Sequence, residues 1–189
     1  MSEPAAPQEP LSIEEYLELE LTSEMRHEYV AGEIHAHAGG TRRHGLISGN
    51  IFASLWTIAR DGPCQVHTAD RLLQASEDVF YYPDVMVVCL PEDEPGNDEA
   101  LFEDSPCLVV EVTSPSTENI DRREKLLAYR NITSLKAYLI VDQRELRVER
   151  HWRDESGRWW RAEAVGTDGI VPIPCPETEL TLPQIYEGL

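Results

Sequence analysis

Two apolar runs near the middle of the chain constrain its fold more than any other feature. They are Asp84–Leu90 (DVMVVCL) and Cys107–Thr113 (CLVVEVT). Near-continuous apolar runs of this length are typical of strands in a sheet that is covered on both faces. Each run nevertheless contains one carboxylate, Asp84 in the first and Glu111 in the second. An isolated buried carboxylate is costly, so each of the two predicts a partner or a metal ion.

The rest of the chain predicts helices and further strands around these runs. Helices are expected at residues 13–21, 42–60 and 121–130. The first begins with a Ser12–Glu15 capping box, the second has an apolar stripe that includes Trp56, and the third has an Asp121–Glu124 cap. A β-hairpin is expected to turn at Ala31-Gly32, between strands at 26–30 and 33–38. Further strands are expected at 64–68, 71–75, 79–82, 135–141, 147–153, 158–165 and 171–176.

This order of elements predicts one α/β domain, with a central mixed sheet flanked by helices and preceded by an N-terminal helix and hairpin. The domain is expected at residues 11–189, and residues 1–10 (MSEPAAPQEP) are expected to be a disordered lead rather than a signal peptide. No apolar run approaches the roughly 18 residues that a membrane helix needs. The four cysteines are scattered without a C-x-x-C motif, which predicts buried reduced thiols and a cytoplasmic location.

The net charge of −19 argues against simple electrostatic binding to nucleic acid. The charge is uneven, because residues 1–120 contain 5 basic and 23 acidic side chains, whereas residues 121–189 contain 11 and 12. A local basic surface in the last third of the chain is therefore compatible with the composition. Pro91–Ser105 is expected to be an exposed acidic loop, and it is also a candidate contact for a basic partner protein.

Asp84 and Glu111, brought together at one end of neighbouring strands, would suit Mg²⁺, which prefers oxygen ligands and retains several waters. A metal ion held there could polarise a phosphodiester and lower the pKa of a bound water. Nuclease sites of this kind often place a lysine two residues after the second acid, but Thr113 occupies that position. Lys125, on the following helix, could instead orient or deprotonate the attacking water.

A structural interpretation of the same residues remains open. In that interpretation Asp84 caps a turn, Glu111 pairs with an arginine, and Lys125 is a solvated helix residue. Glu28, on the first hairpin strand, is a candidate further metal ligand, or else it forms a surface ion pair with Arg26 or a neighbour. The alternation of strand residues would put Arg26, Glu28 and Val30 on one face of that strand.

Three histidines carry weaker signals. His35 and His37 would lie on opposite faces of one strand, which makes them poor joint ligands. His44 could touch a phosphate from the start of its helix, although a helix-terminal polar role is the simpler interpretation. No phosphate-binding loop, nucleophile elbow or zinc-ligand spacing is present.

Taken together, YYPDVMVVC and LVVEVTSPSTENIDRREKLLAYRNITSLKAYLIVD closely resemble the Uma-type putative restriction endonuclease family. The match extends upstream to RHEYVAGEIHAHAGGTRRHGLISGNI and downstream to LPQIYEGL, so it covers nearly the whole chain. The ordered set PD, EVxSPST, D-x-x-x-K and YLIVD makes the resemblance specific. That family belongs to the PD-(D/E)XK nuclease superfamily.

The resemblance implies a restriction-endonuclease-like core and a Mg²⁺-dependent DNA endonuclease, with Mn²⁺ as an alternative metal. It implies Asp84, Glu111 and the Val112 backbone carbonyl as metal ligands, Lys125 as the catalytic lysine, and Glu28 as the early acidic residue of the family. A homodimer is also expected from relatives. Because fold and activity can separate, the alternative is a catalytically inactive nuclease-like fold that serves as a dimeric binding or regulatory module.

Overall fold

A six-stranded mixed sheet forms the centre of the computed structural model, which describes residues 10–37, 39–90, 96–97, 99–113 and 120–189. Its strands lie in the order β11-β10-β9-β8-β6-β3. Their bounds are β3 Cys64–Thr68, β6 Val85–Cys89, β8 Pro106–Thr113, β9 Ala137–Asp142, β10 Arg147–Arg153 and β11 Trp159–Val165. The β8–β9 pair is parallel and the other neighbours are antiparallel, which confirms the expected mixed sheet.

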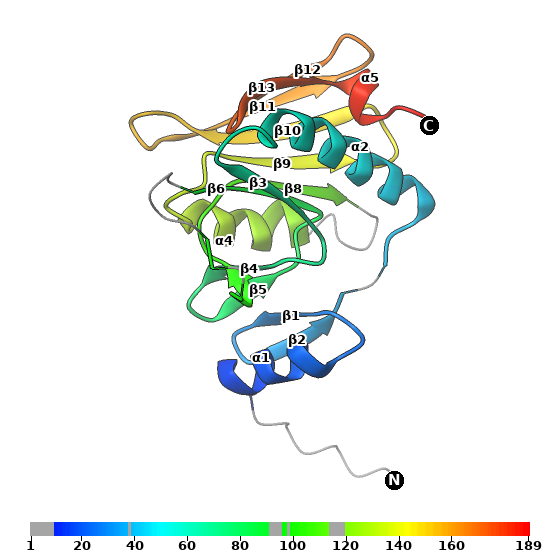
Figure 1. Ribbon diagram of the computed structural model, residues 1–189. Helices are drawn as coiled ribbons and strands as arrows, with labels where there is room; N and C mark the ends of the chain where they lie inside the picture. The colour runs from blue at the N-terminus through cyan, green and yellow to red at the C-terminus, as the bar shows by residue number, and fades with distance from the viewer. Residues whose placement is uncertain (1–9, 38, 91–95, 98, 114–119) are drawn as a thin grey trace.

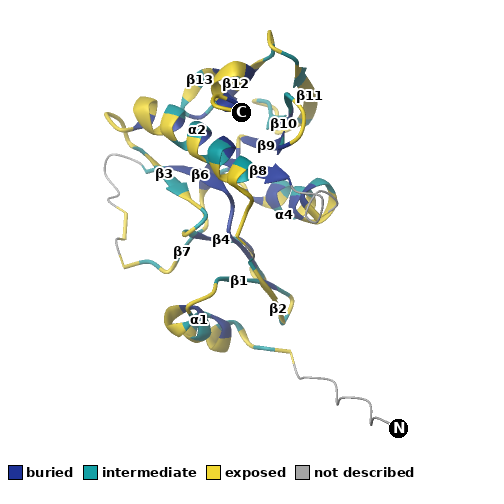
Figure 2. Cartoon of the chain, turned by 90° about the vertical axis from the view of Figure 1, so that its right-hand side faces the viewer, coloured by how far each residue is buried: buried dark blue, intermediate teal, exposed yellow. Residues whose placement is uncertain are grey.

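Strand β8 shows why the central run is apolar almost throughout, because every one of its residues is buried. Leu108, Val110 and Val112 belong to the hydrophobic cluster on one face of the sheet, and Val109 belongs to the cluster on the other. Because the side chains of a strand alternate between its two faces, Glu111 lies on the same face as Val109 and on the opposite face from Val110. Buried residues are concentrated in these central strands (Figure 2).

Helices cover both faces of this sheet (Figure 1). On one face lie α2 (Arg42–Ala59), the short α5 (Leu182–Ile185) and the hairpin of β12 (Ile170–Pro174) and β13 (Glu177–Thr181). On the other lie η1 (Asp121–Lys125), a turn of wider π-helix, and α4 (Leu126–Asn131). The apolar stripe of α2 is narrower than predicted, because Trp56 is 46% exposed.

A second, five-stranded sheet lies beyond α4, in the order β2-β1-β5-β4-β7. Its strands are β1 His27–Val30, β2 Glu33–Ala36, β4 Leu72–Ser76, β5 Val79–Tyr81 and β7 Phe102–Glu103. The predicted hairpin is confirmed, and its turn uses positive φ angles of 49° at Ala31 and 95° at Gly32. Helix α1 (Ile13–Thr22) packs on this sheet and has the expected capping box at Ser12.

Two sequence predictions about loops and cysteines need correction. The segment Pro91–Ser105 is not loop throughout, because β7 within it pairs in parallel with β4; residues 91–95 and 98 lie outside the described part. The prediction of reduced thiols is wrong for this structure, in which disulfides join Cys64 to Cys89 and Cys107 to Cys175. The expected disordered lead lies outside the described residues except for Pro10. In the described part, no helix is long and apolar enough to cross a membrane.

Candidate active site

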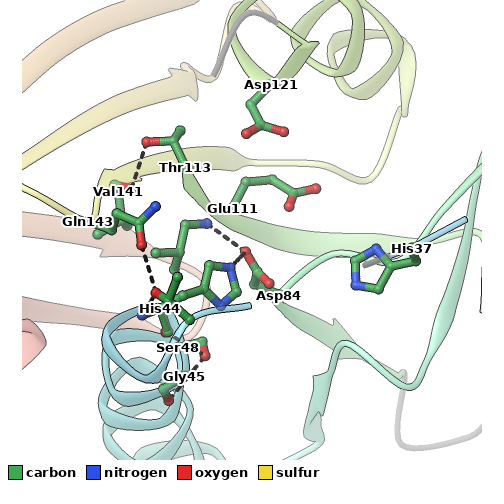
Figure 3. Close-up of polar contacts among 12 residues, drawn as sticks. His37, His44, Gly45, Ser48, Asp84, Glu111, Thr113, Asp121, Val141 and Gln143 are labelled. Carbon is green, nitrogen blue, oxygen red and sulfur yellow. Dashed lines mark hydrogen bonds and ion pairs between the residues drawn. The ribbon is translucent and has the colours of Figure 1, made fainter. Parts of the chain in front are cut away.

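The two carboxylates that interrupt the apolar runs meet at one edge of the central sheet. Strands β6 and β8 are antiparallel with Val85 opposite Val110, and continuing this register by one residue puts Asp84 across from Glu111. The start of β6 and the end of β8 therefore share an edge. Because β9 is parallel to β8, it ends at the same edge. The start of α2 lies there as well, as Figure 3 shows for His44 and Asp84.

A cleft of about 970 Å³ opens at this edge. One wall is the inner face of the β1–β2 hairpin and another is the N-terminal half of α2, with η1 and the end of β8 between them. Arg26, just before β1, and Glu28 and Val30, within it, all line the cleft, which confirms that these three residues share one face. The candidate residues among its lining are Glu28, His37, His44, Asp84, Glu111, Val112, Asp121 and Lys125.

Lys125 is the centre of the polar contacts in the cleft. Its side chain is only 6% exposed, and its Nζ donates to Glu28 Oε1 at 2.9 Å and to Glu111 Oε1 at 3.0 Å. Nζ also lies 3.8 Å from Asp121 Oδ1 and 5.1 Å from the ring centroid of Tyr81. Burial alone would lower the pKa of Lys125, but the surrounding carboxylates raise it above its ordinary value. The charged ammonium form is therefore favoured.

Glu111 is buried, with 4% of its surface exposed, and accepts a second hydrogen bond from Tyr129 Oη at 2.8 Å. Burial raises its pKa well above the ordinary value, and although Lys125 opposes this shift, the nearby carboxylates of Asp121, Asp84 and Glu28 add to it. The same burial raises the pKa of the Tyr129 hydroxyl, which therefore remains a donor. Glu111 is thus held by two donors within a region of excess negative charge.

Asp84 is held by β8 and approached by α2. Its Oδ2 accepts a hydrogen bond of 2.7 Å from the Val112 amide and lies 3.1 Å from His44 Nε2. The hydrogen bond to Asp84 raises the pKa of His44, and an interaction with the Val112 backbone acts in the same direction. His44 is placed there because the Thr41 hydroxyl caps α2 through the His44 amide. The helix-terminal interpretation of His44 is correct, but its ring also belongs to the site.

Asp121 is a third carboxylate on the cleft side of the sheet (Figure 3). The prediction that it caps a helix is wrong, because Ile120 before it already has helical backbone angles. Asp121 is instead 1% exposed and one helical turn before Lys125. Among the described residues, the carboxylates of Glu28, Glu111 and Asp121 thus lie within 3.8 Å of Lys125 Nζ, and Asp84 lies across from Glu111 in the same cleft.

Thr113 lies two residues after Glu111, at the position where nuclease sites of this kind often have a lysine. It is the last residue of β8. It is buried, and its hydroxyl donates to the Val141 carbonyl at 3.3 Å. Lys125 reaches Glu111 from the neighbouring helix, as the sequence suggested. The purely structural interpretation fails for two residues, because Glu111 contacts a lysine rather than an arginine and Lys125 is not solvated. Glu28 likewise pairs with Lys125 and not with Arg26.

A family model described as "Putative restriction endonuclease", Uma2, matches residues 13–183. This chain belongs to the Uma2 family. Two uncharacterized proteins of Synechocystis sp. are similar to it. One, slr1290, is 36% identical over 157 residues, covering 82% of this chain and 81% of the relative. The other, sll1609, is 31% identical over 162 residues, covering 85% of this chain and 91% of that relative.

The fold is also found in a crystal structure of another protein, described as a putative nuclease belonging to DUF820 from Anabaena variabilis ATCC 29413. The two structures match with a TM-score of 0.76 over 94% of this chain and 98% of that one, at 17% sequence identity. The α/β nuclease-like architecture that the sequence predicted is therefore confirmed, as is the family resemblance.

In this Uma2 family member, three site residues carried little or no signal of their own in the sequence. Tyr129 was not singled out from the sequence, Asp121 was predicted to be a cap, and His44 was considered for a phosphate contact but assigned to a helix terminus. The spacing Asp121-x-x-x-Lys125 places both side chains on one helical face, and this was the available signal for Asp121. His35 and His37 both line the cleft, and His37 Nδ1 lies 3.9 Å from Glu28 Oε1. The prediction that these two histidines lie on opposite faces is therefore wrong, because residues two positions apart on a strand share a face.

Proposed function

We propose that this Uma2 family member is a Mg²⁺-dependent endonuclease that hydrolyses DNA phosphodiester bonds. Family membership and the nuclease-like fold support the general class. The observation that carries the finer proposal is the buried Lys125 between Glu28 and Glu111, in a cleft that also contains Asp84. A buried cluster of acids around one ammonium is an arrangement that electrostatic and metal-assisted phosphoryl chemistry can use.

The donor set fits a hard divalent cation. The proposed ligands are one carboxylate oxygen each from Asp84 and Glu111 and the backbone carbonyl of Val112, which lines the cleft. All are oxygen donors, and Mg²⁺ commonly uses one or two carboxylates and completes its shell with water and phosphate. Burial raises the pKa of Glu111, and the neighbouring carboxylates of Asp121, Asp84 and Glu28 add to this shift against the opposing charge of Lys125. Bound Mg²⁺, or Mn²⁺ in its place, would supply Lewis-acid polarisation of the phosphate and a more acidic water.

In this proposal Lys125 positions the attacking water and stabilises the negative charge that develops on the phosphate. Because its raised pKa favours the ammonium form, orientation and charge stabilisation suit it better than proton abstraction. Glu28, considered as a further metal ligand, is assigned first to positioning Lys125, which it contacts through Oε1. Tyr129 holds Glu111 by donating to the same oxygen that Lys125 contacts.

His44 is assigned to orienting Asp84 from α2, since its Nε2 lies 3.1 Å from Asp84 Oδ2. The cleft side of this helix also carries Gly45 and Gly49, which present no side chain, and Ser48. Among the described residues, these small residues leave room on this side of the cleft for a nucleic-acid strand between α2 and the hairpin. The net charge of −19 would repel DNA elsewhere on the surface, so binding is expected to depend on the divalent ion at the cleft.

A plasmid-nicking assay with Mg²⁺ tests the proposal. Wild type is compared with Asp84→Ala, Lys125→Ala and the control Lys136→Ala, whose lysine is exposed. Wild type and the control should nick the plasmid, chelator should abolish the activity, and the two site variants should lose at least about 100-fold. Equal activity in all four preparations would indicate contamination and defeat the enzyme assignment.

A folded wild-type protein that is inactive on duplex and single-stranded DNA with either metal would instead favour the alternative, a nuclease-like binding or regulatory module. Two further parts of the proposal are a homodimer and a cytoplasmic location. Light scattering coupled to gel filtration would test the first, and cell fractionation the second. Neither part is needed for the chemistry assigned to Asp84, Glu111 and Lys125.

A further inference from the structure

All four cysteines of the chain meet at one place, far from the proposed active site. Cys64 begins β3 and lies opposite Cys89, the last residue of β6. Cys107 lies in β8 beside β6, and Cys175 lies between β12 and β13. The cluster is at the opposite end of β6 from Asp84, roughly 16 Å away at the usual rise per strand residue.

The two disulfides are in contact with each other. The Sγ atom of Cys89 lies 3.5 Å from that of Cys107 and 3.2 Å from that of Cys175, although it is bonded to neither. Each disulfide bond could form without placing the sulfur of Cys89 this close to the sulfurs of the other pair. Among the described residues, Cys64, Cys89 and Cys175 form the one set of three His, Cys, Asp or Glu side chains whose ligand atoms all lie within 4.8 Å of one another.

The spacing of sulfurs from different pairs suits a tetrahedral metal. With Zn–S bonds of about 2.3 Å, the sulfurs of a tetrahedral four-thiolate site lie about 3.8 Å apart. The two contacts of Cys89 are already close to that separation. Cys107 and Cys175 are each 6% exposed, whereas Cys64 and Cys89 are only partly buried, so an ion could enter from their side.

We propose that this four-cysteine cluster, when reduced, is a structural Zn²⁺ site. Two equivalents of a cellular dithiol would supply the four electrons and four protons that convert both disulfides to thiols, and would leave as two disulfides of their own. Zn²⁺ then displaces four protons and binds four thiolates. A site closed by four protein ligands has no open position for substrate, which is the structural type.

The effect of such a site follows from the elements that it joins. It would tie the edge strand β3 and the β12–β13 hairpin to β6 and β8. That hairpin is a separate two-stranded sheet, held to the core mainly through apolar side chains. Metal binding by the folded state alone raises stability, so zinc should raise the melting temperature of the reduced protein.

The test uses the full chain, produced with zinc and purified under a phosphine reductant without chelator. Elemental analysis should find about one zinc per chain in wild type and less than about one tenth of that in Cys89→Ser. Glu111→Gln, with its cysteines intact, should retain zinc, which separates this site from the carboxylate cleft. Zinc retained by Cys89→Ser would overturn the proposal.

Because Cys89→Ser could fail to fold, a second measurement uses wild type alone. Co²⁺ added to the reduced protein should produce the strong visible bands of tetrahedral cobalt–thiolate coordination. Zinc should protect four thiols from a maleimide, and a chelator should expose them. A folded, reduced protein with four reactive thiols and no zinc or cobalt signal would refute the site. Disulfides that persist in protein isolated from a reducing cytosol would also refute it. None of these results depends on nuclease activity.

Discussion

Replacing Lys125 with methionine should destabilise the protein by about 3 kcal/mol at about pH 8, the typical cost of leaving a buried charge unpaired. The lysine makes two short charged contacts, at 2.9 Å with Glu28 and 3.0 Å with Glu111. Charged hydrogen bonds are each worth about 1.5–3 kcal/mol, and methionine recovers part of the loss through apolar packing. The side chain is of similar length, so the change removes mainly charge.

The stability lost in Lys125→Met should be smaller at lower pH. The folded-state pKa of Glu111 is raised, so the native protein binds a proton that the unfolded chain has released, and stability falls as pH rises from the ordinary value of 4.5 through the folded pKa. Without Lys125 this pKa should rise further, because the cation that opposes the shift is gone. The deficit of the variant should therefore shrink by about 1 kcal/mol or more between about pH 8 and about pH 5.5.

Urea denaturation in the presence of a chelator measures both quantities. Lys136→Met is the matched control, because Lys136 is the other lysine of the chain and is exposed. It should change stability by no more than about 0.5 kcal/mol. A loss below about 1 kcal/mol for Lys125→Met at about pH 8, or a deficit that does not shrink at lower pH, would refute the reasoning about the buried ammonium.

Three further predictions concern other parts of the structure. Tyr129→Phe removes a donor to Glu111 and should cost about 1–2 kcal/mol in urea denaturation; an unchanged midpoint would contradict this. Burial alone would raise the pKa of Glu149, but hydrogen bonds from an arginine and a histidine lower it to about 2. Its stabilisation is present above its ordinary pKa of 4.5 and is lost as pH falls toward about 2. Glu149→Gln should therefore lose about 2 kcal/mol near neutral pH and show a shallower decline of stability in acid, and parallel pH profiles would count against this. Ser12→Ala removes the α1 cap and should cost about 1 kcal/mol, measurable as a lower melting temperature, whereas the exposed Ser156 offers a comparison outside any helix cap.

The sequence by itself determined the local elements and the core strands. The capping box at Ser12, the hairpin turn at Ala31-Gly32 and the buried run in β8 all appear where they were predicted. These features depend on residues a few positions apart, whose periodicity and caps are visible in the chain. Asp84 and Glu111 were found for the same local reason, since each is a carboxylate within an apolar strand pattern.

Only the tertiary structure decided which side chains surround those carboxylates. Glu28 reaches Lys125 across 97 positions of the chain, and His44 reaches Asp84 across 40. The four cysteines lack any zinc spacing in the sequence, yet four separate parts of the chain bring their sulfurs together. Residues distant in sequence become neighbours through strand order and helix placement, which local patterns do not encode. The chain thus specifies its strands locally, whereas the charge balance around Lys125 and the gathering of the cysteines arise only when the sheets are assembled.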